Sequence, residues 1–266
     1  MVETLAAPLL RVGLCILFIT MVGCSSSLTG WQVRTNSTPM VQSFEPAVLQ
    51  EQPLGLFGAI TLSSHQGDEV ALSHYLGQII ERMAPNWKVV SQQEVTKRIN
   101  REGLAGEYTR MRADFLVSNI LDSNSLRKIA SAIGVRYVFQ PRLAALSQTV
   151  SDRWKFPPFD LRISYTRSSI MRIILQLWDT ETGEVLWGSV AEATMQHEAI
   201  SHDPVYVEDI TRVTFGSMLT DFMNRRTASI YTPVDTVLHS LIAEPIHQEK
   251  GDSESLEKKS SPQPSK

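Results

Sequence analysis

The first 27 residues, MVETLAAPLLRVGLCILFITMVGCSSS, constrain this chain more than any other stretch. An almost wholly apolar run from Val12 to Val22 follows Arg11 and ends at Gly23, Cys24 and three serines. About eleven apolar residues are too few to cross the hydrocarbon core of a bilayer, which needs about twenty. They match the apolar region of a secretory signal peptide, so we expect residues 1–23 to be removed. The alternatives are an uncleaved membrane anchor and an ordinary buried segment.

The end of this run, Met21-Val22-Gly23-Cys24, resembles the lipobox of bacterial lipoproteins. The resemblance implies cleavage before Cys24, a diacylglycerol thioether on its sulfur and palmitate-type acyl chains. Two or more such chains hold a protein stably at a membrane surface. In the lipoprotein families that this segment resembles, an aspartate after the cysteine tends to retain the protein at the inner membrane. Ser25 therefore implies the outer membrane, with the protein facing the periplasm.

The cysteine count limits how the folded body is held together. Cys15 would leave with the leader, and Cys24 would be alkylated, so an intramolecular disulfide is impossible even in an oxidising compartment. The core must then be stabilised by packing alone. The formal net charge of −3 shows no excess of basic residues, which disfavours nucleic acid as a partner.

Composition divides the rest of the chain into three parts. Residues 24–53 are rich in Ser, Thr, Gln and Pro and are interpreted as a lipidated tether, a few of whose residues could dock on the domain. Residues 54–230 form the expected folded domain. Residues 231–266 are expected to be a disordered tail, since the stretch from His247 onward has one large apolar residue and no aromatic one.

Strand and helix patterns alternate within residues 54–230. Apolar residues at helical spacing, such as Leu126, Ile129 and Ile133, predict helices, and a glycine at position 134 is suited to a helix end. Alternation from Met171 to Leu177, followed by a turn at 179–184, predicts an antiparallel hairpin. The expected order is strand 54–61, helix 72–83, strand 87–90, helix 91–101, helix 106–118, helix 125–133, strand 135–139, strands within 161–197 and helix 204–224. This order indicates an α/β fold with a single mixed, partly antiparallel sheet and helices packed on it.

Three local signals support these boundaries. Ser91 with Glu94 forms a capping-box pattern at the start of one helix. Asn124 or Ser125 can cap another. Asp179 and Glu181 are interpreted as turn formers, with Gly183 supplying a positive φ, rather than as groups with a direct chemical role.

Two segments, Ala130 to Phe139 and Leu175 to Trp187, resemble those of known bacterial lipoproteins. Their patterns, A-x-x-hydrophobic-G-V-x-Y-V and L-x-L-x-D-x-x-T-G-E-V-x-W, are similar to those of lipoproteins related to the curli secretion channel subunit (CsgG-like) and of lipoprotein activators of penicillin-binding proteins. The resemblance implies a domain like the N-terminal domain of the translocation protein TolB. Fold analogy alone does not establish an activity.

Motifs of catalysis are missing from the sequence. It has no phosphate-binding G-x-x-x-x-G-K-[ST] loop and no G-x-S-x-G elbow. The two histidines of His197-Glu198-Ala199-Ile200-Ser201-His202 stand at i and i+5, whereas zinc proteases need i and i+4. We interpret this segment as a loop, and His65 and His74 as surface or packing groups. We therefore expect no catalytic residues, no metal and no cofactor.

Two features are better suited to binding. The first is the aromatic and basic segment with Arg153, Trp154, Phe156, Phe159 and Arg162, which could bind a protein partner because aromatics and arginine are typical interface anchors. The equally weighted alternative is that these rings cover one edge of the sheet. The second is a basic set that is more simply explained as a solvated helix face: Arg98, Arg101, Arg110 and Arg112.

These features together predict a non-enzymatic lipoprotein that docks an envelope protein partner. The expected partner is an envelope assembly machine: a cell-wall synthase, or a secretion or transport complex. The alternative is an oligomeric component of a curli-type secretion channel, although residues 147–169 contain two prolines and six charged residues. A metal-dependent hydrolase is a third, less favoured class.

Overall fold

The structure is a computed structural model that describes residues 30–61, 67–152, 155–156, 161–162, 165–199, 207–227 and 232–233. A seven-stranded sheet runs through the centre in the order β3-β2-β4-β7-β8-β1-β9. Its strands are β1 (Gly30–Ser37), β2 (Leu54–Leu56), β3 (Val89–Val90), β4 (Tyr137–Asp152), β7 (Tyr165–Asp179), β8 (Val185–Ala199) and β9 (Thr232–Pro233). The helices are the short 3-10 helix η1 (Pro46–Gln50), α2 (Glu69–Met83), α3 (Gln92–Arg101), α4 (Ala105–Ser118), α5 (Ser123–Ile133) and α6 (Val207–Met223).

The sheet is mixed. Strand β2 pairs in parallel with both β3 and β4, whereas β4, β7, β8, β1 and β9 pair antiparallel with their neighbours. From Leu54 to Met223, the order of the helices and of the strands in the main sheet is the predicted one. The prediction of an α/β fold with one partly antiparallel sheet is therefore confirmed.

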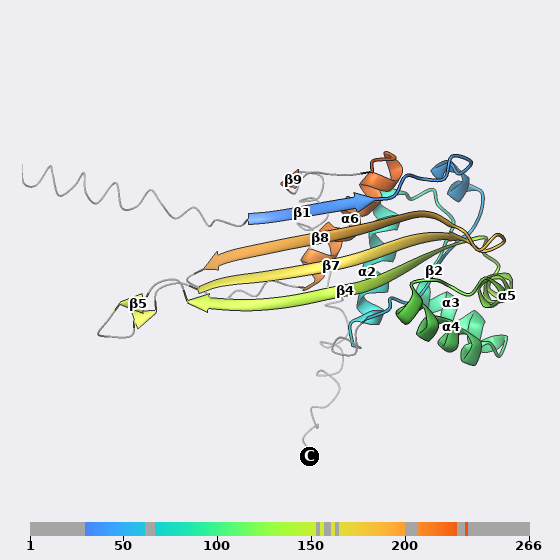
Figure 1. Cartoon of the computed structure of the whole chain (residues 1–266), viewed down its shortest axis with the longest axis horizontal. Helices are drawn as coiled ribbons and strands as arrows, with labels where there is room; N and C mark the ends of the chain where they lie inside the picture. Colours follow the sequence, from blue (N-terminus) through green and yellow to red (C-terminus); the bar gives the residue numbers. More distant parts are fainter. Residues whose placement is uncertain are drawn as a thin grey trace, which may run out of the picture.

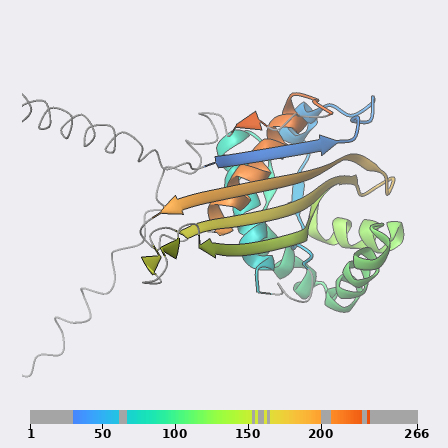
Figure 2. The ribbon, with the colours of Figure 1, turned by 60° about the vertical axis from the view of Figure 1, so that its left-hand side comes forward.

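Helices α2 and α6 cover one face of the sheet (Figures 1 and 2). Alternate residues of β7 point to that face because successive side chains of a strand alternate between faces. Those residues are fully buried: Met171, Ile173, Leu175 and Leu177. At the centre of this core the Phe222 ring of α6 lies 5.0 Å from the Trp187 ring and 5.8 Å from the Phe139 ring, both in edge-to-face geometry.

Helices α3, α4 and α5 pack on the opposite face, at the end of the sheet that contains β2 (Figure 1). Val138 and Trp178 are register partners in β4 and β7 and are both buried beneath these helices. The helices contribute a second group of buried side chains: Val95, Ile99, Met111, Phe115, Leu126, Ile129 and Ile133. The long strands are thus covered on both faces only at this end.

The helix ends follow the predicted chemistry in part. Gly134 ends α5 in the left-handed conformation, at φ 72°, as predicted. The α5 cap is Asp122 rather than Asn124 or Ser125, and its carboxylate accepts from the Ser125 amide at 2.8 Å. Four consecutive residues there, Asp-Ser-Asn-Ser, can all cap a helix, so the sequence alone did not identify which one does.

The capping box at α3 forms only on one side. The Ser91 hydroxyl accepts from the Glu94 amide at 3.3 Å, as predicted. The Glu94 carboxylate instead accepts from Arg98 Nε at 2.8 Å, one turn further along the helix. This ion pair lowers the Glu94 pKa below its ordinary value.

The turn between β7 and β8 is built as predicted. Asp179 Oδ1 accepts from the Glu181 amide at 2.8 Å, and Gly183 adopts φ 77°. A Cβ on Gly183 would lie 2.8 Å from the Ser123 Cβ, so the turn also needs glycine for the close approach of α5. The Asp179 carboxylate lies 3.3 Å from Arg136, which joins the turn to the start of β4.

The predicted tether at 24–53 is wrong over most of its length. Gly30–Ser37 is strand β1, paired with β8 over eight register positions. Phe44 and Leu49, which follow it, are buried in the core. A strand with one exposed face carries many polar residues, and here Gln32, Arg34 and Asn36 made the composition look like that of a linker.

The folded body therefore begins by Gly30 rather than at residue 54. At its other end, Thr232–Pro233 forms β9 within the predicted 231–266 tail. Residues 24–29 of the predicted tether, and residues 231 and 234–266 of the predicted tail, lie outside those that the structure describes. Within the described ranges, none of the helices is both long enough and apolar enough to cross a membrane.

Candidate functional site

The long strands end together at one edge of the molecule, which we call the strand-tip end. The register pairs Asp152 of β4 with Tyr165 of β7, and Tyr165 with Ala199 of β8. Strand β1 starts at the same end, because Gly30 pairs with Gln196. Figure 1 shows these strand ends on the left and helices α3, α4 and α5 on the right. The residues before Gly30 therefore enter the fold at the strand-tip end.

A separate two-stranded ribbon lies beyond the tips of β4 and β7 (Figures 1 and 2). It consists of β5 (Lys155–Phe156) and β6 (Leu161–Arg162) and belongs to the segment predicted to bind a partner. Lys155 is the register partner of Arg162, and Phe156 is the register partner of Leu161. The predicted residues Arg153, Trp154 and Phe159 lie outside the described part of the chain.

The described residues of the strand-tip end include exposed apolar side chains. Val150 of β4 is 62% exposed and Ile170 of β7 is 42% exposed, although both are in regular strands. They lie beyond the reach of the helices that bury the other end of the same strands. A second exposed apolar group lies at the C-terminal end of α4, where Val117 is 87% exposed, and continues two residues beyond the helix, where Ile120 is 63% exposed.

A cavity of about 350 Å³ lies between α2 and the start of α3. It lies beside two adjacent parallel strands whose following helices cover opposite faces of the sheet. Strand β2 leads to α2 on one face, and β3 leads to α3 on the other. Ligands of α/β sheets bind preferentially at such a topological switch point. The sequence analysis missed this site, since it depends on strand order rather than on any local motif. Its lining is Leu56, Val70, Ser73, His74, Gly77, Gln78, Glu81, Ser91, Gln92 and Gln93.

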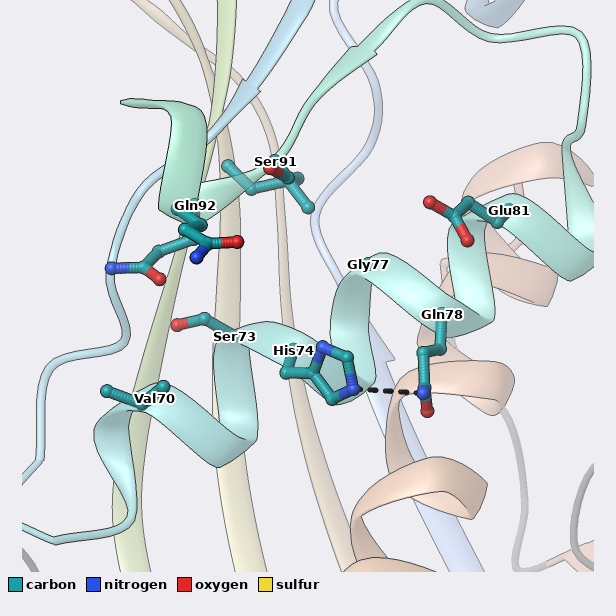
Figure 3. Close-up of a pocket in the computed structure, with 10 residues that line it drawn as sticks. Val70, Ser73, His74, Gly77, Gln78, Glu81, Ser91 and Gln92 are labelled. Carbon is teal, nitrogen blue, oxygen red and sulfur yellow. Dashed lines mark hydrogen bonds between the residues drawn. The ribbon is translucent and has the colours of Figure 1, made fainter. Parts of the chain in front are cut away.

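The cavity offers hydrogen bonding rather than nucleophilic catalysis. The Gln78 amide donates to the His74 imidazole at 3.0 Å, as Figure 3 shows. The Ser73 hydroxyl donates to the Glu69 carbonyl at 2.9 Å and accepts from the Ala59 amide. The two serines of the lining are therefore engaged with backbone groups, and neither is bonded to His74.

Gln78 also connects the cavity to a charged group between α2 and α6. Arg212 is 6% exposed, donates to Gln78 Oε1 at 3.1 Å and forms an ion pair with Glu208 at 2.6 Å. Its guanidinium lies 5.6 Å from the Tyr75 ring centre. Burial, and next to it the charge of Glu208, raise the pKa of Tyr75 above its ordinary value of 10.0. These contacts hold α6 against α2. They compensate the burial of the Arg212 charge, so its burial requires no bound ligand.

The predicted basic set is not one surface. Arg98 donates to the Ile133 carbonyl at 2.6 Å and so joins α3 to the end of α5. Arg112 donates to the Ala59 carbonyl at 2.6 Å and pairs with Glu69 at 2.9 Å. Arg101 is exposed and pairs with Glu102, and Arg110 is exposed. Two of the four residues thus hold the fold together, and the solvated-face interpretation applies to the other two.

The histidines fall in different places. The backbone of His197, Glu198 and Ala199 belongs to strand β8, so the predicted loop is wrong for these three residues. His202 and His65 lie outside the described residues, and His74 lines the cavity. Across the described ranges, no group of three or more His, Cys, Asp or Glu residues is arranged to hold a metal ion.

Comparisons with known proteins give fold-level likeness alone. No protein-family model matches the chain, and no curated protein matches it in sequence. The PelC dodecamer from Paraburkholderia phytofirmans is 8% identical, with a TM-score of 0.40, covering 74% of this chain and 99% of that one. Lipoprotein GNA1162 from Neisseria meningitidis is 11% identical, with a TM-score of 0.38, covering 65% and 96%.

The LpoB C-terminal domain from Salmonella enterica is 16% identical, with a TM-score of 0.32, covering 53% of this chain and 81% of that one. The structures similar to this chain thus include a bacterial lipoprotein. At these TM-scores the likeness carries no argument about activity, partner or assembly. Similarity to the curli channel subunit and to TolB stays a prediction.

Proposed function

We propose that this chain is a lipid-anchored envelope protein that docks a protein partner and has no catalytic activity of its own. The anchor is Cys24, the membrane is the outer membrane, and the domain faces the periplasm. The partner is an envelope assembly machine, which is a cell-wall synthase or a secretion or transport complex.

The observation that carries this proposal is the start of β1 at Gly30, six residues after Cys24. Six residues span at most about 21 Å when fully extended. A lipid on Cys24 would therefore hold the whole domain close to the membrane surface, rather than at the end of a long tether. Such confinement raises the effective concentration of the domain for partners in the same membrane.

The exposed apolar group on α4 is the surface that best suits a protein partner. It consists of Leu116, Val117 and Ile120, which are 38%, 87% and 63% exposed. Neighbouring exposed apolar residues are typical of protein–protein contacts. They lie beside Asn119, whose side chain accepts from Arg142 of β4, ten residues before the strand tip at Asp152. Ten strand residues span about 33 Å, which places this surface well away from the strand-tip end.

The anchor is tested by mass spectrometry of the protein purified from membranes, with Cys24→Ala as the control. We expect a mature N-terminus at a lipidated Cys24, and loss of the membrane fraction in the variant. An intact leader or an unmodified thiol would remove the basis of the proposal.

The docking surface is tested by cross-linking in the cell envelope. We expect Val117→Lys with Ile120→Lys to reduce recovery of the cross-linked partner at least tenfold. The matched control is Val190→Lys with Val185→Lys, which adds the same charge at two partly exposed apolar positions of β8. Equal recovery from both variants, or ring-shaped particles of the purified protein in detergent, would contradict docking through α4.

A further inference from the structure

The strand-tip end extends past the point where the chain enters the fold. Gly30 is opposite Gln196, and β8 continues for three more residues to Ala199. Three strand residues add about 10 Å. The link from Cys24 to Gly30 reaches about 21 Å at most. If Cys24 lies at the membrane, the strand tips are therefore within about 11 Å of the lipid surface even when the link is fully stretched.

The β5–β6 ribbon occupies this narrow space, beyond the tips of β4 and β7 (Figure 1). Its register places two apolar residues, Phe156 and Leu161, directly opposite each other. It also places two basic residues, Lys155 and Arg162, directly opposite each other. The four described residues of the ribbon are thus one apolar pair and one basic pair.

A ribbon of this composition suits the boundary between lipid headgroups and acyl chains. Aromatic residues are enriched at that boundary. Basic residues near an anionic surface are attracted to it and are screened within a Debye length. The ribbon has a charge of +2 and no acidic residue among its four members.

We infer that the β5–β6 ribbon rests on the lipid surface, because its basic residues, Lys155 and Arg162, favour anionic headgroups and its apolar residues, Phe156 and Leu161, favour the interface. The ribbon is then a second membrane contact, distinct from the lipid on Cys24. The inference rests on the proposed anchor, and it changes the occupant expected for Phe156 and Arg162 from a protein to a lipid. With two contacts the sheet stands on the membrane and directs α3, α4 and α5 away from it.

The contact is tested with the full lipidated protein in vesicles that contain phosphatidylglycerol. A thiol-reactive fluorophore is attached at Phe156→Cys or, in the matched sample, at Val117→Cys on α4. Phospholipids with brominated acyl chains quench fluorophores that touch the interface. We expect the label at position 156 to be quenched several-fold more strongly than the label at position 117. Equal quenching, or none at position 156, would overturn the inference.

The charge requirement is tested with the same label at position 156. Each basic residue near an anionic membrane adds attraction between the ribbon and the surface. We therefore expect Lys155→Gln with Arg162→Gln to lower the ratio of docked to undocked ribbon about thirtyfold. The control pair, Lys97→Gln with Arg101→Gln, removes the same charge from exposed positions of α3 and should leave quenching unchanged. Neutral phosphatidylcholine vesicles should reproduce the effect of the ribbon variant. Quenching that ignores both changes would overturn the role of the basic pair.

Mass spectrometry of each sample separates this inference from the proposed function. A lipidated Cys24 with an unquenched label at position 156 overturns the ribbon contact and leaves the anchor in place. A Cys24 without lipid overturns the anchor, and with it the geometry from which the ribbon contact follows.

Discussion

The two ends of strands β4 and β7 differ in what covers their side chains. At one end Val138 and Trp178 are buried beneath α3, α4 and α5, while Phe139 and Leu177 are buried on the other face. At the strand-tip end of the same strands, Val150 and Ile170 are 62% and 42% exposed. The β4–β7 pairing runs from one end to the other, with one register shift between Leu143 and Ala145. Strand pairing therefore continues where burial stops, and we expect stability to depend on the covered end and membrane contact on the exposed end.

The largest difference between the ends should appear when a central ring is removed. Phe222→Ala deletes a fully buried ring that contacts Trp187 and Phe139, and we expect the free energy of unfolding to fall by about 3–5 kcal/mol. Val150→Ala at the strand tip should change it by less than about 0.5 kcal/mol. Urea unfolding of both variants measures the two values. Similar losses in both would contradict the separation of stability between the ends.

The turn at the covered end should be the next most sensitive position. Gly183→Ala adds a Cβ at a positive φ, which costs about 1–2 kcal/mol, and places it 2.8 Å from the Ser123 Cβ. We expect a total loss of about 2–3 kcal/mol in urea unfolding. Ser123→Gly in the same chain should recover the part that comes from the overlap, while the backbone strain remains. No recovery in the double variant would mean that α5 does not press against this turn.

The helix cap of α5 gives a smaller effect. Asp122→Ala removes the carboxylate that accepts from the Ser125 amide, and we expect a loss of about 1 kcal/mol. Asp122→Asn is the matched control and should be close to neutral, because asparagine caps a helix as well as aspartate does. Thermal unfolding distinguishes the two variants. A large loss in the asparagine variant would indicate that the charge, rather than the cap, stabilises this end.

A pH-dependent effect is expected where α6 meets β1. Asp221 is 3% exposed and accepts from the Thr35 hydroxyl, and burial raises its pKa above the ordinary value of 3.8. A raised pKa in the folded state means that the protonated carboxyl adds stability below the unfolded pKa, and that this stability is lost as pH rises through the folded pKa. Compared with Asp221→Asn, the natural chain should therefore become less stable as pH rises from about the ordinary pKa of 3.8 through the raised folded pKa. Urea midpoints that differ by a constant amount across this range would contradict the assignment.

The sequence predicted the covered end much better than the exposed one. Leu126, Ile129 and Ile133 at helical spacing, followed by Gly134, predicted α5 and its end, because buried side chains and a positive φ restrict which residues can occur. Strand β1 was missed for the opposite reason. Its outward residues Gln32, Arg34 and Asn36 are polar. The inward residues that alternate with them are Val33, Thr35 and Ser37. Only Val33 is apolar, so the strand lacks a clear apolar alternation.

The candidate sites show the same limit. The segment around Phe156 and Arg162 was singled out from its aromatic and basic residues, but the sequence could not give its position relative to the start of the fold. That position depends on Gly30 pairing with Gln196, which is a contact between residues 166 positions apart. The cavity between α2 and α3 was missed because it arises from the order of β3, β2 and β4. No local pattern at Ser73, His74 or Gln78 indicates it.

The pairing of β1 inside the sheet has a mechanical consequence. A force on the residues before Gly30 acts along the axis of β1, toward the strand-tip end. It therefore loads the eight register positions between β1 and β8 in shear, all at the same time, instead of opening them one by one like a zipper. A domain attached in this way would resist being pulled from its attachment far better than one whose first strand could be peeled from the sheet edge.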